Sequence, residues 1–154
     1  MRRTLSVLLE NESGALSRVV ALFSQRGFNI ESLTVAPTDD ESLSRMTIVA
    51  NGDEKILEQI ETQLHKLIDV FKVINLSACE HVEREVLLLK VRATGSARDE
   101  LKRMTDIFRG QIVDIAPKLY TIQLTGTSEK LNAFIEAVKA ETTIIEIVRS
   151  GIIS

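Results

Sequence analysis

Several residue types that build specialised sites are scarce in this chain of 154 residues. Cys79 is the only cysteine, which excludes an internal disulfide and a metal site built from several thiolates. No apolar run approaches the ~20 residues needed to cross a bilayer. Met1 to Arg3 lead directly into a predicted strand rather than into a signal-type apolar segment. We therefore expect a cytoplasmic protein that does not enter a membrane.

Aromatic side chains and excess positive charge are also scarce. The chain has no tryptophan, 4% aromatic residues and a formal net charge of −3 at pH 7. Nucleic-acid surfaces need clustered basic residues, and single-stranded RNA is bound largely by stacking on aromatic rings. The composition therefore argues against a nucleic-acid partner. With 44% hydrophobic and 27% charged residues, the chain is typical of one globular domain or of two small ones.

The first half of the chain alternates between the period of a strand and that of a helix. Ser13 is the expected N-cap of the first helix, Gly27 its C-terminal stop, and Asp53 opens the second helix. The order strand–helix–strand–strand–helix–strand predicts a ferredoxin-like βαββαβ unit. Strands are predicted over residues 5–9, 28–35, 43–50 and 71–76. The two helix stripes are expected to be Leu16, Val19, Val20 and Phe23, and Ile56, Leu57, Ile60, Leu64, Leu67 and Ile68.

The second half predicts the same order of elements again. Ser96 and Asp99 suggest a capping-box-like start for its first helix. Leu88 lies as many residues after Leu5 as Arg109-Gly110 lies after Arg26-Gly27. These equal separations suggest a structural repeat. Strands are expected over residues 86–93, 112–115, 119–124 and 144–148, and the helix stripes are Leu101, Met104, Ile107 and Phe108, and Leu131, Phe134, Ile135 and Val138.

We therefore predict an α+β chain of two tandem ferredoxin-like units, with domains over residues 1–77 and 82–154. In such a sheet the strand order is 4-1-3-2, so the second strand lies at an edge. Exposed edge strands are commonly covered by the same strand of a second copy about a twofold axis. The pattern predicts a homodimer joined through the first units.

The turn from the first strand into the first helix is the best candidate for a binding site. Unpaired N–H groups and the positive end of the helix dipole favour an anion there, and Gly14 lets a ligand approach the backbone. Asn29, at the start of the second strand, offers both a donor and an acceptor. From the pattern alone, Asn11 and Gly14 are more often part of an ordinary polar turn.

Ordered stretches along the whole chain carry a further signal: Arg2–Asn11, Gly14–Val19, Asn29–Val35, Leu43–Thr47, Gln63–Leu67, His81–Glu85 and Phe108–Gly110. Together they resemble the small regulatory subunit of acetohydroxyacid synthase (acetolactate synthase), whose first domain is an ACT amino-acid-sensing domain. Members of that family usually continue into a short polar tail, whereas this chain stops at Ser154. On this resemblance the effector-binding residues are Asn11, Gly14, Ala15, Leu16, Asn29 and Ile30. The second unit is left out, because Ile112 stands where Asn29 would be and residues 94–99 lack the Asn-x-x-Gly spacing.

The resemblance implies a regulatory subunit with no catalytic activity of its own. It implies that the chain activates a catalytic large subunit in branched-chain amino acid biosynthesis, and that valine, bound between the ACT domains of a dimer, inhibits it by feedback. Thiamine diphosphate, Mg²⁺ and FAD are expected on the catalytic subunit, and no cofactor is expected here. Leucine and isoleucine stay open as effectors, since one methylene in an apolar pocket is worth only ~1–3 kcal/mol.

Two other functions fit the sequence less well. Paired RNA-recognition modules share the βαββαβ order but need aromatic residues on their central strands, and residues 6–9 and 45–49 have none. An autonomous enzyme would need converging acid, base or nucleophilic groups. His65 and His81 lack the partner spacing of a zinc site or a catalytic triad, and the carboxylates of residues 39–41 are typical of a solvated loop.

Overall fold

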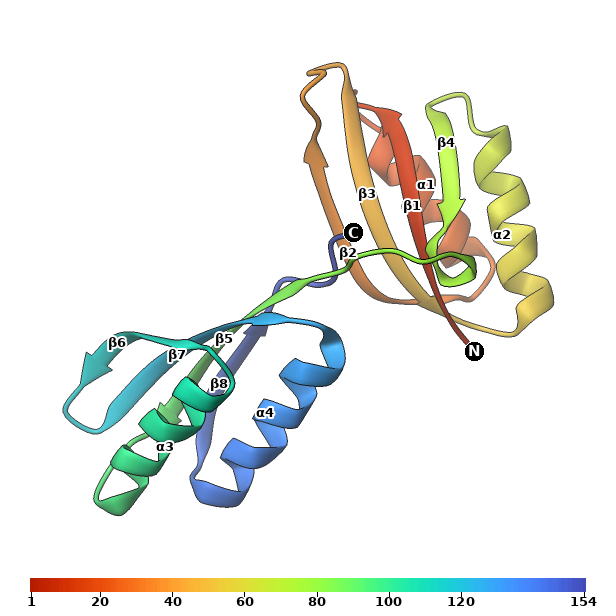
Figure 1. The fold of residues 1–154 in the computed structure, drawn as a ribbon. Helices are drawn as coiled ribbons and strands as arrows, with labels where there is room; N and C mark the ends of the chain where they lie inside the picture. Colours follow the sequence, from red (N-terminus) through yellow and green to blue (C-terminus); the bar gives the residue numbers. More distant parts are fainter. The chain divides into compact units, whose positions relative to one another are not determined.

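The computed structural model describes all residues from Met1 to Ser154 and divides into two compact units. The first unit comprises Met1–Val82 together with Ile152–Ser154, and the second comprises Glu83–Gly151. The first unit contains β1 (Arg2–Glu10), α1 (Ala15–Gln25), β2 (Asn29–Pro37), β3 (Leu43–Asn51), α2 (Glu54–Lys66), β4 (Val70–Asn75) and the short 3₁₀ helix η1 (Leu76–Ala78) (Figure 1).

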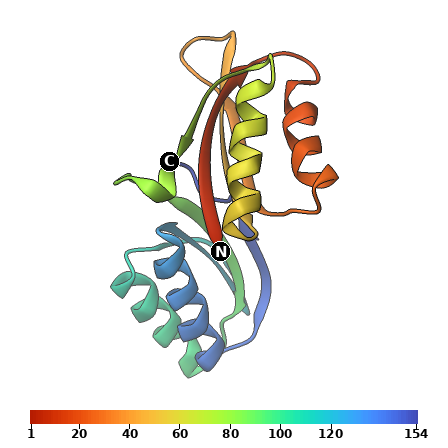
Figure 2. The same ribbon diagram turned by 90° about the vertical axis from the view of Figure 1, so that its right-hand side faces the viewer.

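The second unit repeats this order with β5 (Glu85–Arg92), α3 (Ser96–Ile107), β6 (Gln111–Ala116), β7 (Leu119–Gly126), α4 (Ser128–Glu141) and β8 (Ile144–Arg149). The two antiparallel sheets have the strand orders β2-β3-β1-β4 and β6-β7-β5-β8. In each unit both helices cover the same face of the sheet (Figure 2). The predicted fold class and the predicted strand order are therefore confirmed, with β2 and β6 at sheet edges.

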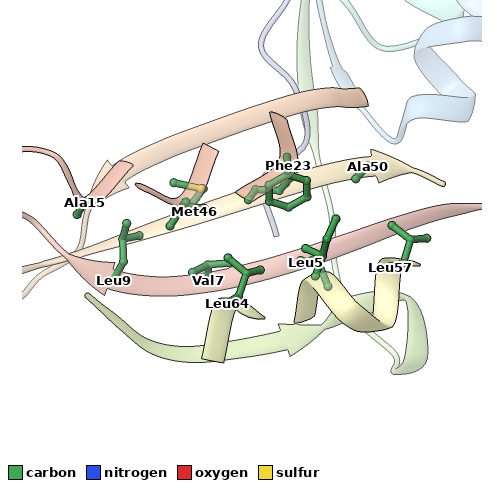
Figure 3. Close-up of a cluster of buried hydrophobic side chains, with 12 residues drawn as sticks. Leu5, Val7, Leu9, Ala15, Phe23, Met46, Ala50, Leu57 and Leu64 are labelled. Carbon is green, nitrogen blue, oxygen red and sulfur yellow. The ribbon is translucent and has the colours of Figure 1, made fainter. Parts of the chain in front are cut away.

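The core of the first unit lies between its sheet and its helices. Leu5, Val7 and Leu9 alternate along β1 and are at most 1% exposed, and Phe23 of α1 and Leu64 of α2 pack onto them (Figure 3). Burying a large aliphatic or aromatic side chain contributes ~1.5–3 kcal/mol relative to leaving it exposed. The period-2 strand pattern and the period-3.6 helix pattern thus meet in one apolar layer.

The second core has the same construction and confirms the predicted stripe of α4. All four residues of that stripe are buried, and the rings of Phe108 and Phe134 meet edge to face at 5.1 Å between centroids. Buried strand residues complete the layer on the sheet side: Leu87, Leu89, Val91, Tyr120, Ile122 and Leu124.

The structure shows the repeat, but equivalent residues of the two units are separated by one residue fewer than the sequence suggested. The β1–β4 ladder shifts register between Leu8 and Leu9, and the β5–β8 ladder shifts between Lys90 and Val91, so these two steps are equivalent. On this alignment the counterpart of Leu5 is Leu87, which is fully buried, whereas Leu88 is 41% exposed. Because side chains alternate along a strand, a slip by a single position exchanges the two faces.

The same correction applies at the two equivalent turns. Gly27 has φ 72° after α1, and the residue in this left-handed conformation after α3 is Arg109, with φ 62°. By this offset the counterpart of Asn29 is Gln111, not Ile112; each is the first residue of its strand. The second unit therefore does carry a carboxamide at this position.

Two predicted helix caps were wrong. Gly14, not Ser13, is the N-cap of α1; α3 begins at Ser96 as predicted, but its N-cap is Gly95, so no capping box forms at Ser96 and Asp99. Both glycines have positive φ, a conformation that residues with a Cβ rarely adopt. By contrast, Asp53 caps α2 as expected, because its Oδ1 accepts a hydrogen bond from the Ile56 N–H at 3.3 Å.

Three residues assigned to helix stripes are exposed. Leu16 of α1 is 40% exposed, and α1 buries Ala15 in its place. Ile68 lies beyond the end of α2 and is 91% exposed, and Ile107, the last residue of α3, is 67% exposed. Val49 is fully buried, although it lies on the face of β3 opposite Met46 and Ile48, so both faces of β3 bury apolar side chains. Periodicity alone overestimated the length of the stripes on α2 and α3.

The end of the chain also differs from the expected division at residues 82–154. The last three residues group with the first unit. The Thr34 hydroxyl in β2 donates to the Ile152 carbonyl at 3.0 Å, and the Ser154 hydroxyl donates to the Val82 carbonyl at 2.9 Å. These hydrogen bonds connect the C-terminal residues to the first unit. No local sequence pattern predicts them.

None of the helices is both long and apolar enough to cross a membrane.

Candidate functional site

The turn after β1 presents the start of α1 without a side-chain cap. Gly14 is the N-cap in a left-handed conformation, with φ 89°, and no side chain accepts a hydrogen bond from the first turn of the helix. No acidic residue lies in that turn either. The positive end of the helix is therefore not neutralised from within α1, as an anion site requires.

Asn11 shapes this turn by binding the loop between β2 and β3. Its backbone N–H donates to the Ser42 carbonyl at 2.8 Å, and its side-chain Nδ2 donates to the Glu41 carbonyl at 3.0 Å. Figure 1 shows the end of β1, this loop and the start of β4 at the same end of the first unit. Asn11 therefore has a structural role as well as its expected binding role.

Arg18 lies over the same turn. A Cβ placed on Gly14 would come within 2.9 Å of its Nη1, so the guanidinium closely covers the glycine. The Nε of Arg18 donates to a carboxylate oxygen of Asp69, which is only 4% exposed. The backbone carbonyl of Asp69 in turn accepts a hydrogen bond from the Glu10 N–H at 2.8 Å. α1 is thus tied to the segment between α2 and β4.

The turn also carries a local excess of negative charge. Carboxylate oxygens of Glu10, Glu12 and Asp69 lie within 4.8 Å of one another. The Glu12 carboxylate is the main cause that raises the pKa of Glu10, followed by partial desolvation and Asp69. The hydrogen bond to Asp69 is the main cause that raises the pKa of Arg18. Oxygen ligands suit a hard cation, but Arg18 already supplies a positive charge at this cluster.

A shallow cavity of ≈ 290 Å³ opens beside this turn. Both apolar and polar side chains line it, which suits a small ligand with a charged end and an aliphatic end. Leu16 and Val35, both partly exposed, contribute to the apolar part of the lining. The lining comprises Leu9, Glu10, Asn11, Glu12, Leu16, Val35, Ala36, Pro37 and Ser44.

The structure brings only some of the predicted site residues together. Asn11, Gly14 and Leu16 surround the turn, while the side chain of Ala15 is 1% exposed and lies in the core, so Ala15 offers its backbone. Asn29 and Ile30 lie at the opposite end of β2, about 26 Å away at ~3.3 Å per strand residue. Within one chain, the predicted site is divided between the two ends of the sheet.

Sequence reasoning missed Arg18, Asp69 and Val35. Arg18 could have been identified from the sequence, because a residue four positions after Gly14 lies on the same face of the helix. Asp69 was not, because it is 51 residues away from Arg18 in the sequence. Only the pairing of β1 with β4 brings the two together.

Comparison with known proteins identifies the family. Residues 5–72 match the ACT domain of acetohydroxyacid synthase small subunits, and residues 84–154 match the family described as the small subunit of acetolactate synthase. The chain is 75% identical over 154 residues to the acetolactate synthase small subunit of Haemophilus influenzae, covering 100% of this chain and 94% of that protein. The chain belongs to the acetolactate synthase small-subunit family.

Other members of this small-subunit family are also similar along nearly their whole length. The isozyme 3 small subunit of Escherichia coli is 65% identical over 153 residues, covering 99% of this chain and 94% of that protein. The crystal structure of the small subunit from Thermotoga maritima superposes with a TM-score of 0.86 at 38% identity, covering 99% of this chain and 95% of that one. As a small subunit, the chain is a regulatory component of acetolactate synthase rather than its catalytic chain.

Proposed function

We propose that this small subunit senses valine at the turn after β1, activates a catalytic large subunit and confers feedback inhibition by valine in branched-chain amino acid biosynthesis. The observation that carries the proposal is the uncapped start of α1 at Gly14, which opens beside a cavity lined in part by apolar side chains. An amino-acid carboxylate suits the helix start, and an aliphatic side chain suits Leu16 and Val35.

The complete site is proposed to span two chains. β2 is an edge strand, so a second copy is able to extend the sheet through it in an antiparallel arrangement. Such a twofold axis would place Asn29 and Ile30 of one copy near the Asn11 turn of the other. The division of the predicted residues between the two ends of β2 supports this arrangement.

The two domains are proposed to have different roles. The domain over residues 1–77 senses the amino acid, and the domain over residues 82–154 completes the subunit without a second effector site. Thiamine diphosphate, Mg²⁺ and FAD belong on the catalytic subunit, where two 2-oxo acids condense. This chain is proposed to act only by binding.

Feedback inhibition requires valine to bind the activating and the non-activating forms of the complex unequally, since equal affinity shifts no population. A site between two chains supplies such a difference if closure on the ligand moves one first unit against the other. Valine would then alter the surface that the dimer offers to the catalytic subunit.

Reconstitution tests the proposal. Acetolactate formation is measured with the catalytic subunit alone, with this chain added, and with this chain plus valine. We expect stimulation in the second mixture and its reduction in the third. Absence of stimulation would reject activation of the catalytic subunit, whereas stimulation that valine does not reduce would remove the feedback site and leave the partnership intact.

A further inference from the structure

The turn between α2 and β4 and the start of β4 expose one large apolar side chain each. Ile68 is 91% exposed and Phe71 is 59% exposed, whereas their neighbours Leu67 and Val70 pack against the core of the first unit. The packing of this unit does not depend on Ile68 or Phe71, because Leu67 and Val70 already anchor the turn to the core. Isolated apolar residues on a surface are common, but these two lie close together in the sequence, one just before β4 and one at its start, and we treat them as one patch.

This turn is held firmly. The Asp69 carboxylate is bound by Arg18, the Asp69 carbonyl accepts from the Glu10 N–H, and the Val70 N–H donates to the Leu67 carbonyl at 3.1 Å. Ile68 and Phe71 are therefore presented by an ordered backbone rather than by a loose loop. Preorganised groups lose less conformational entropy on binding, which favours them as contacts for another protein.

An acidic rim lies beside the turn at Asp69, which stands between Ile68 and Phe71 in the sequence. Glu10 and Glu12 lie beside Asp69, and Arg18 is the cation bound to this cluster through Asp69. Carboxylate oxygens of Glu10, Glu12 and Asp69 lie within 4.8 Å of one another, and the Glu12 carboxylate is the main cause that raises the pKa of Glu10. We name Ile68, Phe71, Glu10 and Glu12 the β4-turn surface.

Resting on the proposed function, we propose that the β4-turn surface docks the catalytic large subunit, at an apolar pocket bordered by Arg or Lys. The acidic rim favours a partner that is basic at this contact and disfavours a second copy of the chain, because a twofold contact would set one acidic rim against another. β4 and β2 are opposite edges of the sheet, so the surface stays free when two copies pair through β2.

The same contacts link this surface to the effector turn. The Arg18 guanidinium lies over Gly14 and binds Asp69, between Ile68 and Phe71 in the sequence. An amino-acid carboxylate at the start of α1 would attract Arg18 and weaken its hold on the turn. Loss of that hold would lower affinity for the catalytic subunit, which gives valine a physical route to inhibition.

The double variant Ile68→Ser/Phe71→Thr tests the surface. Acetolactate synthase activity is titrated with the full-length chain, and we expect half-maximal stimulation to need at least about tenfold more of the variant, as for the loss of central apolar anchors. The thermal shift caused by valine should persist. Ile107→Ser, which removes another exposed isoleucine from α3, is the matched control and should titrate like the wild type.

Glu12→Gln tests the charge. Raising the salt concentration should weaken binding of the wild type to the catalytic subunit more steeply than binding of this variant. If the wild type fails to bind the catalytic subunit, the proposed function itself is wrong. If the wild type binds and the double variant binds equally well, with equal salt dependence for Glu12→Gln, the function stands and the β4-turn surface is overturned.

Discussion

Gly14 is the residue on which the proposed effector site depends most directly. In Gly14→Asp, a carboxylate would occupy the space and the positive field meant for the ligand, close to Arg18. We expect valine affinity to fall by roughly 100-fold or more, since like charges brought together cost several kcal/mol. Titration calorimetry with the purified chain measures this loss.

Gly27→Asp is the matched control for that variant. Gly27 also has a positive φ, at 72°, and a Cβ there would meet nothing within 4 Å, so the backbone strain is comparable while the site is untouched. Valine should bind Gly27→Asp as it binds the wild type. Equal loss in both variants would assign the effect to unfolding, and wild-type affinity in Gly14→Asp would disprove the placement of the carboxylate.

Glu10 makes stability depend on pH in a direction that can be checked. Its raised pKa means that the folded chain holds this proton more tightly than the unfolded chain, so the ionised group is destabilising above the folded pKa and this penalty disappears as the pH falls. Glu10→Gln should therefore raise the melting temperature near pH ~7, with the gain vanishing toward pH ~4.

Glu12→Gln should change stability with the same sign, because it removes the main cause of the Glu10 shift. Thermal melts of the wild type and both variants across this pH range measure the effect. A gain that stays constant with pH in both variants would show that the repulsion between these carboxylates does not govern it.

At the scale of elements, Glu85 joins the two ends of the second unit. One oxygen of its buried carboxylate accepts from the Arg149 Nε at 3.1 Å, and the other accepts from the Gly151 N–H at 3.1 Å. Glu85→Ala should destabilise the second unit by roughly 1.5–3 kcal/mol, since it removes the buried acceptor of charge-assisted hydrogen bonds from the partly exposed Arg149 and leaves the Gly151 N–H without its partner.

The exposed cross-strand pair Lys90–Glu146, at 3.8 Å between β5 and β8, provides the comparison. Glu146→Gln should cost no more than about 0.5 kcal/mol. Denaturant unfolding monitored in the second unit measures both changes. Similar small losses in the two variants would contradict the structural role given to Glu85.

The arrangement of the β2 strands decides whether the effector site belongs to one chain or to two. Asn11→Ala and Asn29→Ala should each weaken valine binding by ~1–3 kcal/mol through a lost hydrogen bond. If the site spans two chains, mixing the two variants produces dimers with one intact site and one that lacks both carboxamides. A fraction of sites with wild-type affinity should therefore reappear.

Calorimetry on the mixture, after subunit exchange, measures that recovered fraction. A mixture of either variant with itself is the control, and it should recover nothing. Uniformly weak binding in a mixture shown to contain heterodimers would place all the ligand contacts within one chain.

For the whole molecule, the sequence by itself determined the order of elements and much of the core. Alternation along β1 and the stripe of α4 follow from local physics, because a strand or helix must bury one face wherever it packs. The Gly14 turn could also be predicted from the sequence, because a polar turn with glycine between a strand and a helix has few conformations.

Only the tertiary structure decided what depends on contacts between distant segments. The pairing of β1 with β4 brings Arg18 to Asp69 and places the Glu10 backbone against Asp69, which stands between the exposed Ile68 and Phe71 in the sequence. The register shifts in the two sheets set the offset of the repeat. They make Leu87 the structural counterpart of Leu5, while Leu88 points outward. No local period encodes such features, because each arises from a choice of partner and register that is made only when the sheets assemble.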